Sequence, residues 1–420
     1  MKKLFSLLLT LAFAAIGFAA PRYNELPSIL DGSMSLYDFS AVEPSALPDS
    51  LAPVYVDYVA RHGARFLTSE NKVTACEKAL KKASERGSLT KAGKSFMELL
   101  QGVRKHTDGQ WGMLSPIGKE QELRLGKEMA EMYPQIFGAS GASVASVASY
   151  VPRVVETMDQ FTIAIADTYE GIDTKAASGK AYDHLTRFFV TDKRYDDWRK
   201  EGEWKNVYDS FVDRHVSVEP ALRLVGKNSG MSDKELRRLT YDMYKVLQGM
   251  RAASLPAPTD EWMTMEEYRA CWEATNLEKY FQYSISPLSD IPAQGASYLL
   301  YSWLDTMAHL EVGQLSPGLS GVFGHAETLL PFFALLGIEE TIARPADYDQ
   351  LSTEWSDAYL TPLAANIAVI YSRGPSGALY ASMRLNGRNI SPVNDSRLIV
   401  PAAELRSFWL ARLLRFSLGD

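Results

Sequence analysis

The segment Val54–Ser69 passes from a strand into a turn crowded with positive charge. Residues 54–60 are mainly β-branched and aromatic, and Pro53 precedes them, which predicts a strand. The next five residues, Arg61-His62-Gly63-Ala64-Arg65, bring two guanidinium groups and an imidazole into one turn. Groups that are or can become cations repel one another, so either an anion binds among them or the fold tolerates the repulsion.

A strand followed by a basic residue and a helix occurs a second time. Residues 72–86 carry apolar residues at helical spacing and end at Gly87, which predicts a helix after the first strand. Residues 143–149 alternate valine with small residues, Arg153 follows, and a helical pattern runs from Val154 to about residue 169. Strands that alternate with helices predict an α/β domain.

Composition divides the chain into two kinds of region. Residues 175–290 are rich in aromatic and charged residues and have few β-branched runs, which indicates a mostly α-helical insert. Side-chain character alternates along residues 366–373 and along residues 378–385. A Gly-Pro-Ser-Gly turn separates the two stretches, which predicts a hairpin. We therefore expect residues 21–174 and 291–420 to form one α/β domain that the helical insert interrupts.

The first twenty residues differ from the rest in charge and hydropathy. Lys2 and Lys3 precede the apolar run Leu4–Phe18, and small residues surround its end. This is the layout of a secretory signal peptide, with a buried N-terminal helix as the alternative. No later stretch approaches about 18 consecutive apolar residues, the length that spans a bilayer. We expect residues 1–20 to be a signal peptide and the mature chain to be exported, periplasmic or secreted, without a membrane span.

Several classes of site are disfavoured. The formal net charge of −7 argues against non-specific nucleic-acid binding. The two cysteines, Cys76 and Cys271, cannot build a thiolate metal cage, although they could form one disulfide. The six histidines show no metal-ligand spacing, and His325-Ala326-Glu327 offers two ligands that would point apart on a helix. Neither a Gly-x-Ser-x-Gly elbow nor a phosphate-binding glycine-rich loop occurs. We expect no metal and no cofactor.

Positive charge is concentrated after the turn despite the negative total. Residues 61–105 contain eleven basic and four acidic residues. Such a run is either a solvated helix face or a local attraction for an anionic substrate, and the sequence supports both interpretations equally.

The turn itself suits phosphoryl transfer. Guanidinium groups bind tetrahedral oxyanions through charge-assisted hydrogen bonds at every relevant pH. Arg61 and Arg65 would push His62 toward its neutral, nucleophilic form by like charge. Gly63 would let the backbone turn sharply beside the ligand. Phosphoryl transfer needs chiefly alignment and charge neutralisation, so His62 could act as a covalent nucleophile without a metal.

Three motifs resemble those of a known family. Arg61–Arg65 resembles the Arg-His-Gly-x-Arg-x-Pro signature of the histidine acid phosphatases, with Leu67 in place of the proline. His325-Ala326-Glu327 is similar to the second signature of the family in its multiple inositol polyphosphate phosphatase branch, and Ser149–Phe161 is similar to the stretch that carries the strand-end arginine. The resemblance spans roughly residues 54–390. It implies a three-layer α/β fold, with helices on both sides of a central mixed sheet and a helical insert.

The resemblance also implies a role for each matching residue. His62 would be the nucleophile that becomes a phosphohistidine. Arg61, Arg65 and Arg153 would bind the phosphate oxygens, and His325 would donate a further hydrogen bond. The structural alternatives are that Arg153 starts its helix paired with an acid and that His325 is a satisfied histidine beneath an apolar helix.

Glu327 would protonate the departing alkoxide and then activate water. A proton donor must be partly protonated at the working pH, so we expect burial or neighbouring acids to raise the pKa of Glu327. The alternative is an acid in the first turn of a helix, which stabilises the helix dipole.

The sequence therefore predicts an exported monomer that hydrolyses small phosphorylated substrates, most like the inositol polyphosphate phosphatases that degrade phytate. Arg187 matches a segment of the same branch and would contact a distal phosphate, or would merely stack on its aromatic neighbours. The alternatives are a broad acid phosphatase or sugar-phosphate phosphatase of the same mechanism, a non-catalytic protein that binds phosphorylated ligands, and a metallohydrolase.

Overall fold

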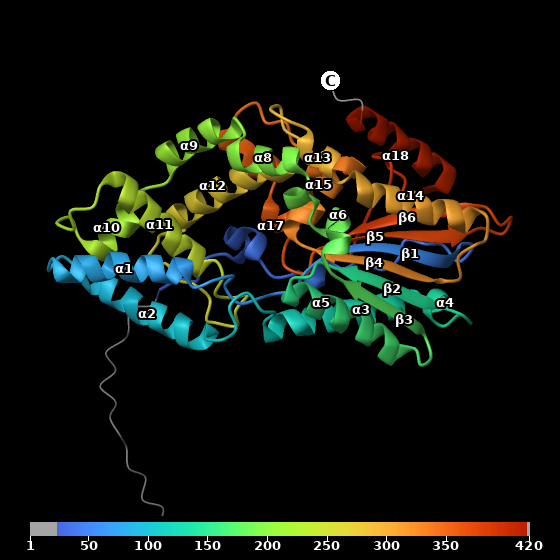
Figure 1. Cartoon of the computed structure of the whole chain (residues 1–420), viewed down its shortest axis with the longest axis horizontal. Helices are drawn as coiled ribbons and strands as arrows, with labels where there is room; N and C mark the ends of the chain where they lie inside the picture. Colours follow the sequence, from blue (N-terminus) through green and yellow to red (C-terminus); the bar gives the residue numbers. More distant parts are fainter. Residues whose placement is uncertain (1–22, 418–420) are drawn as a thin grey trace, which may run out of the picture.

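A mixed sheet of eight strands lies at the centre of one half of the molecule (Figure 1). The computed structural model describes residues 23–417, so the predicted signal peptide at residues 1–20 lies outside the described residues. The strand order is β3-β2-β4-β1-β5-β6-β7, and β8 pairs with β6. The strands are β1 Ala52–Arg61, β2 Ser143–Ala148, β3 Asp173–Ser178, β4 Gly318–Gly324, β5 Asn366–Arg373, β6 Leu379–Leu385, β7 Arg388–Ile390 and β8 Ile399–Pro401.

One part of the sheet is parallel and the other is antiparallel. β3, β2, β4 and β1 run parallel, with Arg61 opposite Gly324 and Ala148 opposite Phe323. The carboxyl ends of these strands therefore lie at one edge of the sheet, and the loops that follow them meet there. β5 and β6 form the predicted hairpin, and β1 confirms the strand predicted at residues 54–60.

Helices α3 and α5 cover one face of the sheet (Figure 1). Ser115 caps α3, as its position before a proline predicts, and its hydroxyl accepts a hydrogen bond from the N–H of Gly118 at 3.4 Å. Tyr58 of β1 stacks on Phe161 of α5 with ring centroids 4.8 Å apart. The helices of this layer are α3 Pro116–Met132, α4 Pro134–Phe137 and α5 Pro152–Thr168.

Helices α14, α15 and α18 cover the opposite face (Figure 1). Trp303 of α14 contacts Phe332 of α15 and Trp409 of α18, with ring centroids 4.7 and 5.7 Å away. The three layers confirm the expected α/β sandwich around a mixed sheet. The helices of this layer are α13 Ile291–Gly295, α14 Ser297–Glu311, α15 Ala326–Leu336 and α18 Ala402–Ser417.

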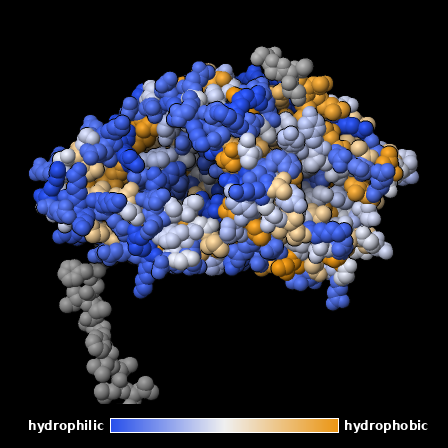
Figure 2. Space-filling view, viewed as in Figure 1, coloured by the Kyte–Doolittle hydropathy of each residue, from blue (hydrophilic) through white to orange (hydrophobic). Residues whose placement is uncertain are grey.

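The other half of the molecule is helical, and we call it the helical lobe (Figure 1). Its apolar core is continuous with the core between the sheet and α14, whereas hydrophilic residues dominate its surface in Figure 2. Its main helices are α1 Asn71–Glu85, α2 Lys91–Thr107, α8 Lys193–Glu201, α9 Trp204–His215, α10 Glu219–Val225, α11 Asp233–Leu247 and α12 Met265–Tyr283. Short helices complete the fold: η1 Ser28–Met34, η2 Phe39–Ala41, η3 Lys180–Tyr182, α6 Asp183–Thr186, α7 Phe188–Thr191, η4 Glu339–Thr341, η5 Tyr348–Gln350, α16 Leu351–Glu354 and α17 Asp357–Leu360.

The helical part differs from the expected insert, residues 175–290, at its margins. β3 ends at Ser178 and so carries the sheet across the expected boundary at residue 174. Helices α1 and α2 come from the part expected to be α/β, yet Val73 and Leu80 of α1 share a core with Leu239 of α11. The apolar stripe of a helix shows that it is packed on one side, without showing which partner it packs against.

The two cysteines are not paired in the folded chain. Cys76 and Cys271 are both buried and both free, so the disulfide that the sequence left open does not form. Within residues 23–417, no helix combines the length and apolarity needed to cross a membrane.

Candidate active site

The loop that follows β1 is held in place by two helices. The N–H of Gly63 donates to Oγ1 of Thr157 in α5 at 3.2 Å, and the N–H of Ala64 donates to Oε1 of Gln121 in α3 at 2.8 Å. The N–H of His62 donates to the carbonyl of Gly324 in β4 at 3.1 Å. Three consecutive backbone N–H groups are therefore satisfied, and the loop has a defined position at the carboxyl edge of the sheet.

Gly63 is required for a different reason from the one the sequence suggested. A Cβ at Gly63 would lie 2.7 Å from the carbonyl oxygen of Gly118 in α3, and a Cβ at Gly118 would lie 2.0 Å from that of Ala64. The backbone of Gly63 does not adopt the left-handed conformation. The glycine therefore allows the loop to approach α3 closely, and the expected sharp turn beside the ligand is not what demands it.

His62 is buried and held in one tautomer. Its side chain is 3% exposed, and Nδ1 lies 2.9 Å from the carbonyl oxygen of Gly63. A carbonyl only accepts, so Nδ1 carries the proton and Nε2 of the neutral ring keeps its lone pair. Burial lowers the pKa of His62 well below its usual range, and Arg153 and Arg61 lower it further. The direction agrees with the expectation from like charge, although burial is the larger cause.

Three guanidinium groups surround His62 without a carboxylate partner. Arg61 donates from Nη1 to the carbonyls of Ser33 and Thr361, each at 2.5 Å, whereas Arg65 and Arg153 make single hydrogen bonds to nearby carbonyls. The Nε atom of each of the three arginines is buried and has no hydrogen-bond partner. Within residues 23–417, none of the three forms an ion pair with an acid. Buried cations with unused donors indicate an anion-binding site.

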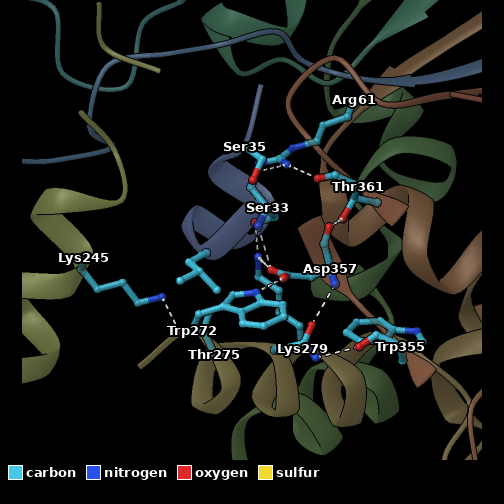
Figure 3. A network of polar contacts seen from close by, with 12 residues as sticks. Ser33, Ser35, Arg61, Lys245, Trp272, Thr275, Lys279, Trp355, Asp357 and Thr361 are labelled. Atoms are coloured by element: carbon cyan, nitrogen blue, oxygen red, sulfur yellow. Dashed lines mark hydrogen bonds and ion pairs between the residues drawn. The ribbon is translucent and has the colours of Figure 1, made fainter. Parts of the chain in front are cut away.

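A polar network behind Arg61 fixes its orientation (Figure 3). The buried carboxylate of Asp357 in α17 accepts hydrogen bonds from Lys279 at 2.8 Å, from the Ser33 N–H at 2.9 Å and from the Trp272 indole at 3.1 Å. Ser33 lies in η1, and the carbonyl of Ser33 itself accepts a hydrogen bond from Arg61. η1, α17 and α12 therefore meet behind Arg61, a candidate phosphate-binding residue.

His325 follows β4 and faces His62. The two imidazole rings are 5.6 Å apart between centroids in an edge-to-face arrangement, and Nε2 of His325 lies 3.2 Å from the hydroxyl of Ser149 after β2. The hydroxyl of Thr328 accepts from the His325 N–H at 3.0 Å and donates to the carbonyl of Thr186 at 2.7 Å. The start of α15 is thereby tied to the segment after β3.

Glu327 lies one residue into α15, and its pKa does not behave as expected. Burial alone would raise the pKa, but the positive charges of His325, Arg61 and Lys279 and a backbone N–H outweigh burial and lower it to about 2. Burial lowers the pKa of His325 to about 3, so His325 is neutral near pH 7. The groups named above that stay positively charged at that pH are Arg61 and Lys279. The expected rise is therefore wrong for the free enzyme, because the cations that attract an anion also stabilise this carboxylate.

Arg187 lies at the rim of the same site. Its guanidinium carbon is 4.7 Å above the centre of the Tyr150 ring, and Nη1 donates to the Tyr150 hydroxyl. The charge of Arg187 contributes to the lowered pKa values of Arg153 and His325, so it faces the cluster. The stacked geometry that the sequence left open is present, with Tyr150 as the partner instead of an aromatic neighbour in the sequence, and Arg187 remains partly exposed.

Sequence reasoning missed the residues that position the loop and Arg61. Gln121 and Lys279 lie outside the three motifs, whereas Ser149 and Thr157 lie within the stretch Ser149–Phe161 but were given no role there. Ser149 could have been found, because it follows a parallel strand as His62 does. In the described part of the chain, no group of three or more His, Cys, Asp or Glu side chains is arranged to hold a metal ion, and the expectation of a metal-free enzyme stays a prediction.

Most of the basic run at residues 61–105 is a solvated helix face. On α1 and α2, Arg104 pairs with Glu70 at 2.6 Å and with Glu77 at 2.7 Å. The other lysines and arginine of these two helices, apart from the half-buried Lys72, are exposed: Lys78, Lys81, Lys82, Arg86, Lys91, Lys94 and Lys105. Only Arg61, Arg65 and Lys72 of the run lie near the site.

Comparisons with known proteins place this geometry in a family. The family model described as histidine phosphatase superfamily (branch 2) matches residues 54–374. Among solved structures, the Bifidobacterium longum multiple inositol polyphosphate phosphatase in complex with inositol hexasulfate has a TM-score of 0.77 at 17% identity, over 91% of this chain and 98% of that chain. The phytase from D. castellii has a TM-score of 0.69 at 15% identity, over 92% and 85%. The Klebsiella sp. ASR1 phytase has a TM-score of 0.53 at 13% identity, over 87% and 97%.

No curated protein sequence matches the chain. At identities of 17% and below, the solved structures show the shared fold. The family model, in contrast, matches most of the chain, and the matched range includes the Arg-His-Gly loop, Arg153 and the His-Ala-Glu motif. The chain therefore belongs to the histidine phosphatase superfamily, branch 2, and is a phosphomonoesterase.

Proposed function

We propose that the enzyme hydrolyses inositol polyphosphates through a phosphohistidine formed at Nε2 of His62. The observation that carries this proposal is the set of three guanidinium groups with unused buried donors around a neutral imidazole. Binding alone needs the arginines and has no use for an imidazole whose tautomer leaves Nε2 free to attack. The non-catalytic alternative is therefore disfavoured.

The first chemical step forms one bond and breaks another. The lone pair on Nε2 of His62 attacks the phosphorus, and the bond between phosphorus and the leaving oxygen breaks. Arg61, Arg65 and Arg153 stabilise the charge on the three remaining oxygens, and His325 donates a further hydrogen bond. Glu327 gives its proton to the leaving alkoxide.

The second step restores the enzyme. The carboxylate of Glu327 removes a proton from water, the resulting hydroxide attacks phosphorus, and the N–P bond breaks to release phosphate. Glu327 ends protonated and His62 ends neutral, and Glu327 loses its proton to solvent once phosphate leaves, since its pKa in the free enzyme is about 2.

The low pKa of Glu327 in the free enzyme fits this cycle if its proton is taken up with the substrate. A phosphate that binds among the arginines offsets their positive charge, and its own negative charge disfavours the nearby carboxylate. Both effects raise the pKa of Glu327 in the complex. A monoanionic phosphate group, whose second pKa is about 6, can also carry the proton into the site.

The substrate class is supported by the fold and by excess positive charge. The fold is shared across almost the whole length of a multiple inositol polyphosphate phosphatase solved with inositol hexasulfate, and Arg187 adds a partly exposed cation beside the phosphate site. We further propose that the enzyme is exported, on the layout of residues 1–20, and that it acts as a monomer.

The test is product analysis with phytate, combined with trapping of the intermediate. Wild-type enzyme should release phosphate from phytate, and acid-labile, base-stable phosphohistidine should appear after rapid mixing and an alkaline quench. His62→Ala should abolish both signals. Phosphate release that survives in folded His62→Ala overturns the nucleophile, and equal kcat/KM for glucose 6-phosphate and phytate overturns the substrate class in favour of a broad phosphatase.

A further inference from the structure

One acid of α3 is completely buried without a partner. The side chain of Glu122 is 0% exposed, and within residues 23–417 neither oxygen of its carboxyl group makes a hydrogen bond. Glu122 directly follows Gln121, which accepts from the Ala64 N–H, and it lies four residues after Gly118, which contacts the same loop. Buried carboxyl groups are normally hydrogen-bonded or paired with a cation, so a role is needed to explain this one.

The carboxyl group of Glu122 lies against the backbone of the catalytic loop. A Cβ at Gly63 would lie 3.1 Å from Oε1 of Glu122 and 2.7 Å from the carbonyl oxygen of Gly118. Gly63 directly follows His62, and its carbonyl oxygen fixes the tautomer of His62 through Nδ1 at 2.9 Å. α3 therefore touches the residue that orients the nucleophile at two points, and one of these points is a carboxyl group.

The surroundings of Glu122 favour its neutral form. Burial raises its pKa well above the ordinary value of 4.5, and no charged side chain of the described residues, from α5, from β1 or from the loop, counteracts burial. The titratable groups that sense its charge are Tyr58 in β1 and Tyr37 in the segment before η2, and that charge adds to the raised pKa of each tyrosine. An ionised Glu122 would therefore be a buried charge without a cation beside it.

We propose that Glu122 is a positioning residue that holds the His62 loop against α3 only in its neutral form, so that ionisation of Glu122 displaces the loop and inactivates the enzyme at alkaline pH. The inference rests on His62 as the proposed nucleophile. Because the carboxyl group is fully enclosed, an ionised Glu122 gains hydration only when α3 separates from a segment packed on it, and the loop is in contact with Oε1. A displacement of about 1 Å in a catalytic group lowers the rate roughly 100-fold.

The experiment compares Glu122→Gln with Glu120→Gln, which makes the same chemical change at an exposed acid of α3. The readout is kcat for p-nitrophenyl phosphate between about pH 5 and pH 10, given as the ratio of variant to wild type. Glutamine cannot ionise, so the ratio for Glu122→Gln should be constant at acidic pH and then rise about tenfold per pH unit once Glu122 of the wild type ionises, up to about 100-fold. The ratio for Glu120→Gln should not change with pH.

Urea unfolding gives a second measurement that does not depend on turnover. The unfolded chain releases the Glu122 proton near the ordinary pKa of 4.5, whereas the folded chain keeps it. Stability is therefore fully present below that pH and decreases as the pH rises toward the pKa of the folded state. Between about pH 5 and pH 7, the unfolding constant of the wild type should increase about tenfold per pH unit relative to that of Glu122→Gln.

The proposal requires both results. A constant kcat ratio at alkaline pH, or parallel unfolding of wild type and Glu122→Gln across this range, overturns it. Glu122→Met carries the same two predictions if Glu122→Gln does not fold, because methionine is also neutral and of similar length. Phosphatase activity that survives in folded His62→Ala overturns the proposed function instead, and it leaves the unfolding result unchanged, so the two failures are distinguishable.

Discussion

Replacing Gly118 by alanine tests whether α3 sets the position of the His62 loop. A Cβ at this position would lie 2.0 Å from the carbonyl oxygen of Ala64 and 2.7 Å from its nitrogen. Both of these Ala64 atoms already make hydrogen bonds. The carbonyl oxygen of Ala64 accepts from the Ser115 N–H at 2.9 Å, and the N–H of Ala64 donates to Oε1 of Gln121 at 2.8 Å. The new methyl group therefore cannot be accommodated by turning a side chain.

The magnitude follows from the required displacement. Real Cβ atoms essentially never approach other atoms closer than 3.0 Å, so loop and helix must separate by about 1 Å. A misplacement of about 1 Å in a catalytic group costs roughly 100-fold in rate. We expect kcat of Gly118→Ala to fall about 100-fold, together with a loss of about 1–3 kcal/mol in the free energy of unfolding from overpacking.

Two other glycines provide matched controls. Gly102 in α2 has no atom within 4 Å of the added methyl group, so Gly102→Ala should keep its activity and gain up to about 1 kcal/mol in stability. Gly126 lies in α3 as well, but its Cβ would meet the carbonyl of Phe161 in α5 at 2.3 Å. Gly126→Ala should lose similar stability with a smaller loss of kcat, because the clash lies away from the loop.

The assay is initial-rate hydrolysis of p-nitrophenyl phosphate, combined with thermal unfolding followed by circular dichroism. A folded Gly118→Ala variant with kcat within about 3-fold of wild type would refute the claim that contact with α3 positions His62. Equal losses of kcat in Gly118→Ala and Gly126→Ala would show that activity merely follows stability.

Three further outcomes are expected. Glu327→Gln should lower kcat/KM for an alkyl phosphate by roughly 10²–10⁴-fold and kcat/KM for p-nitrophenyl phosphate far less, since kcat/KM reports formation of the phosphohistidine and p-nitrophenolate leaves without a proton donor; equal losses of kcat/KM would contradict the donor role. Asp357→Asn should cost about 3 kcal/mol in urea unfolding, because it leaves the cation of Lys279 without its partner, and should raise KM by releasing the segment that holds Arg61. Because the pKa of His62 lies well below 6.5, its neutral form persists on acidification, and kcat/KM corrected for substrate ionisation should not decline from pH 7 to pH 5; an ordinary histidine would lose about 30-fold.

The family and the strand-end location of the candidate site could be predicted because they depend on local sequence. Residue type identifies β1 and the hairpin of β5 and β6, and Ser115 before a proline identifies the start of α3. His62, Arg153 and His325 each follow a parallel strand, and parallel strands align their carboxyl ends. Local patterns were therefore enough to expect these residues at one edge.

Other features depend on packing and were missed. The pKa of Glu327 depends on charges that arrive from β1 and α12, and the direction predicted from its sequence neighbours was wrong. The need for glycine at position 63 comes from α3, which lies more than fifty residues further along the chain. No local pattern carries such information.

The amino-acid order alone determined the family motifs and the candidate site residues, because strand ends, capping residues and the charged turn are encoded within a few positions. Only the tertiary structure decided how those side chains are charged and held, because desolvation and Coulomb interactions depend on distances in space between residues far apart in the chain. The pKa of Glu327 is the plainest example, since β1 and α12 must pack around the start of α15 before Arg61 and Lys279 can lower it.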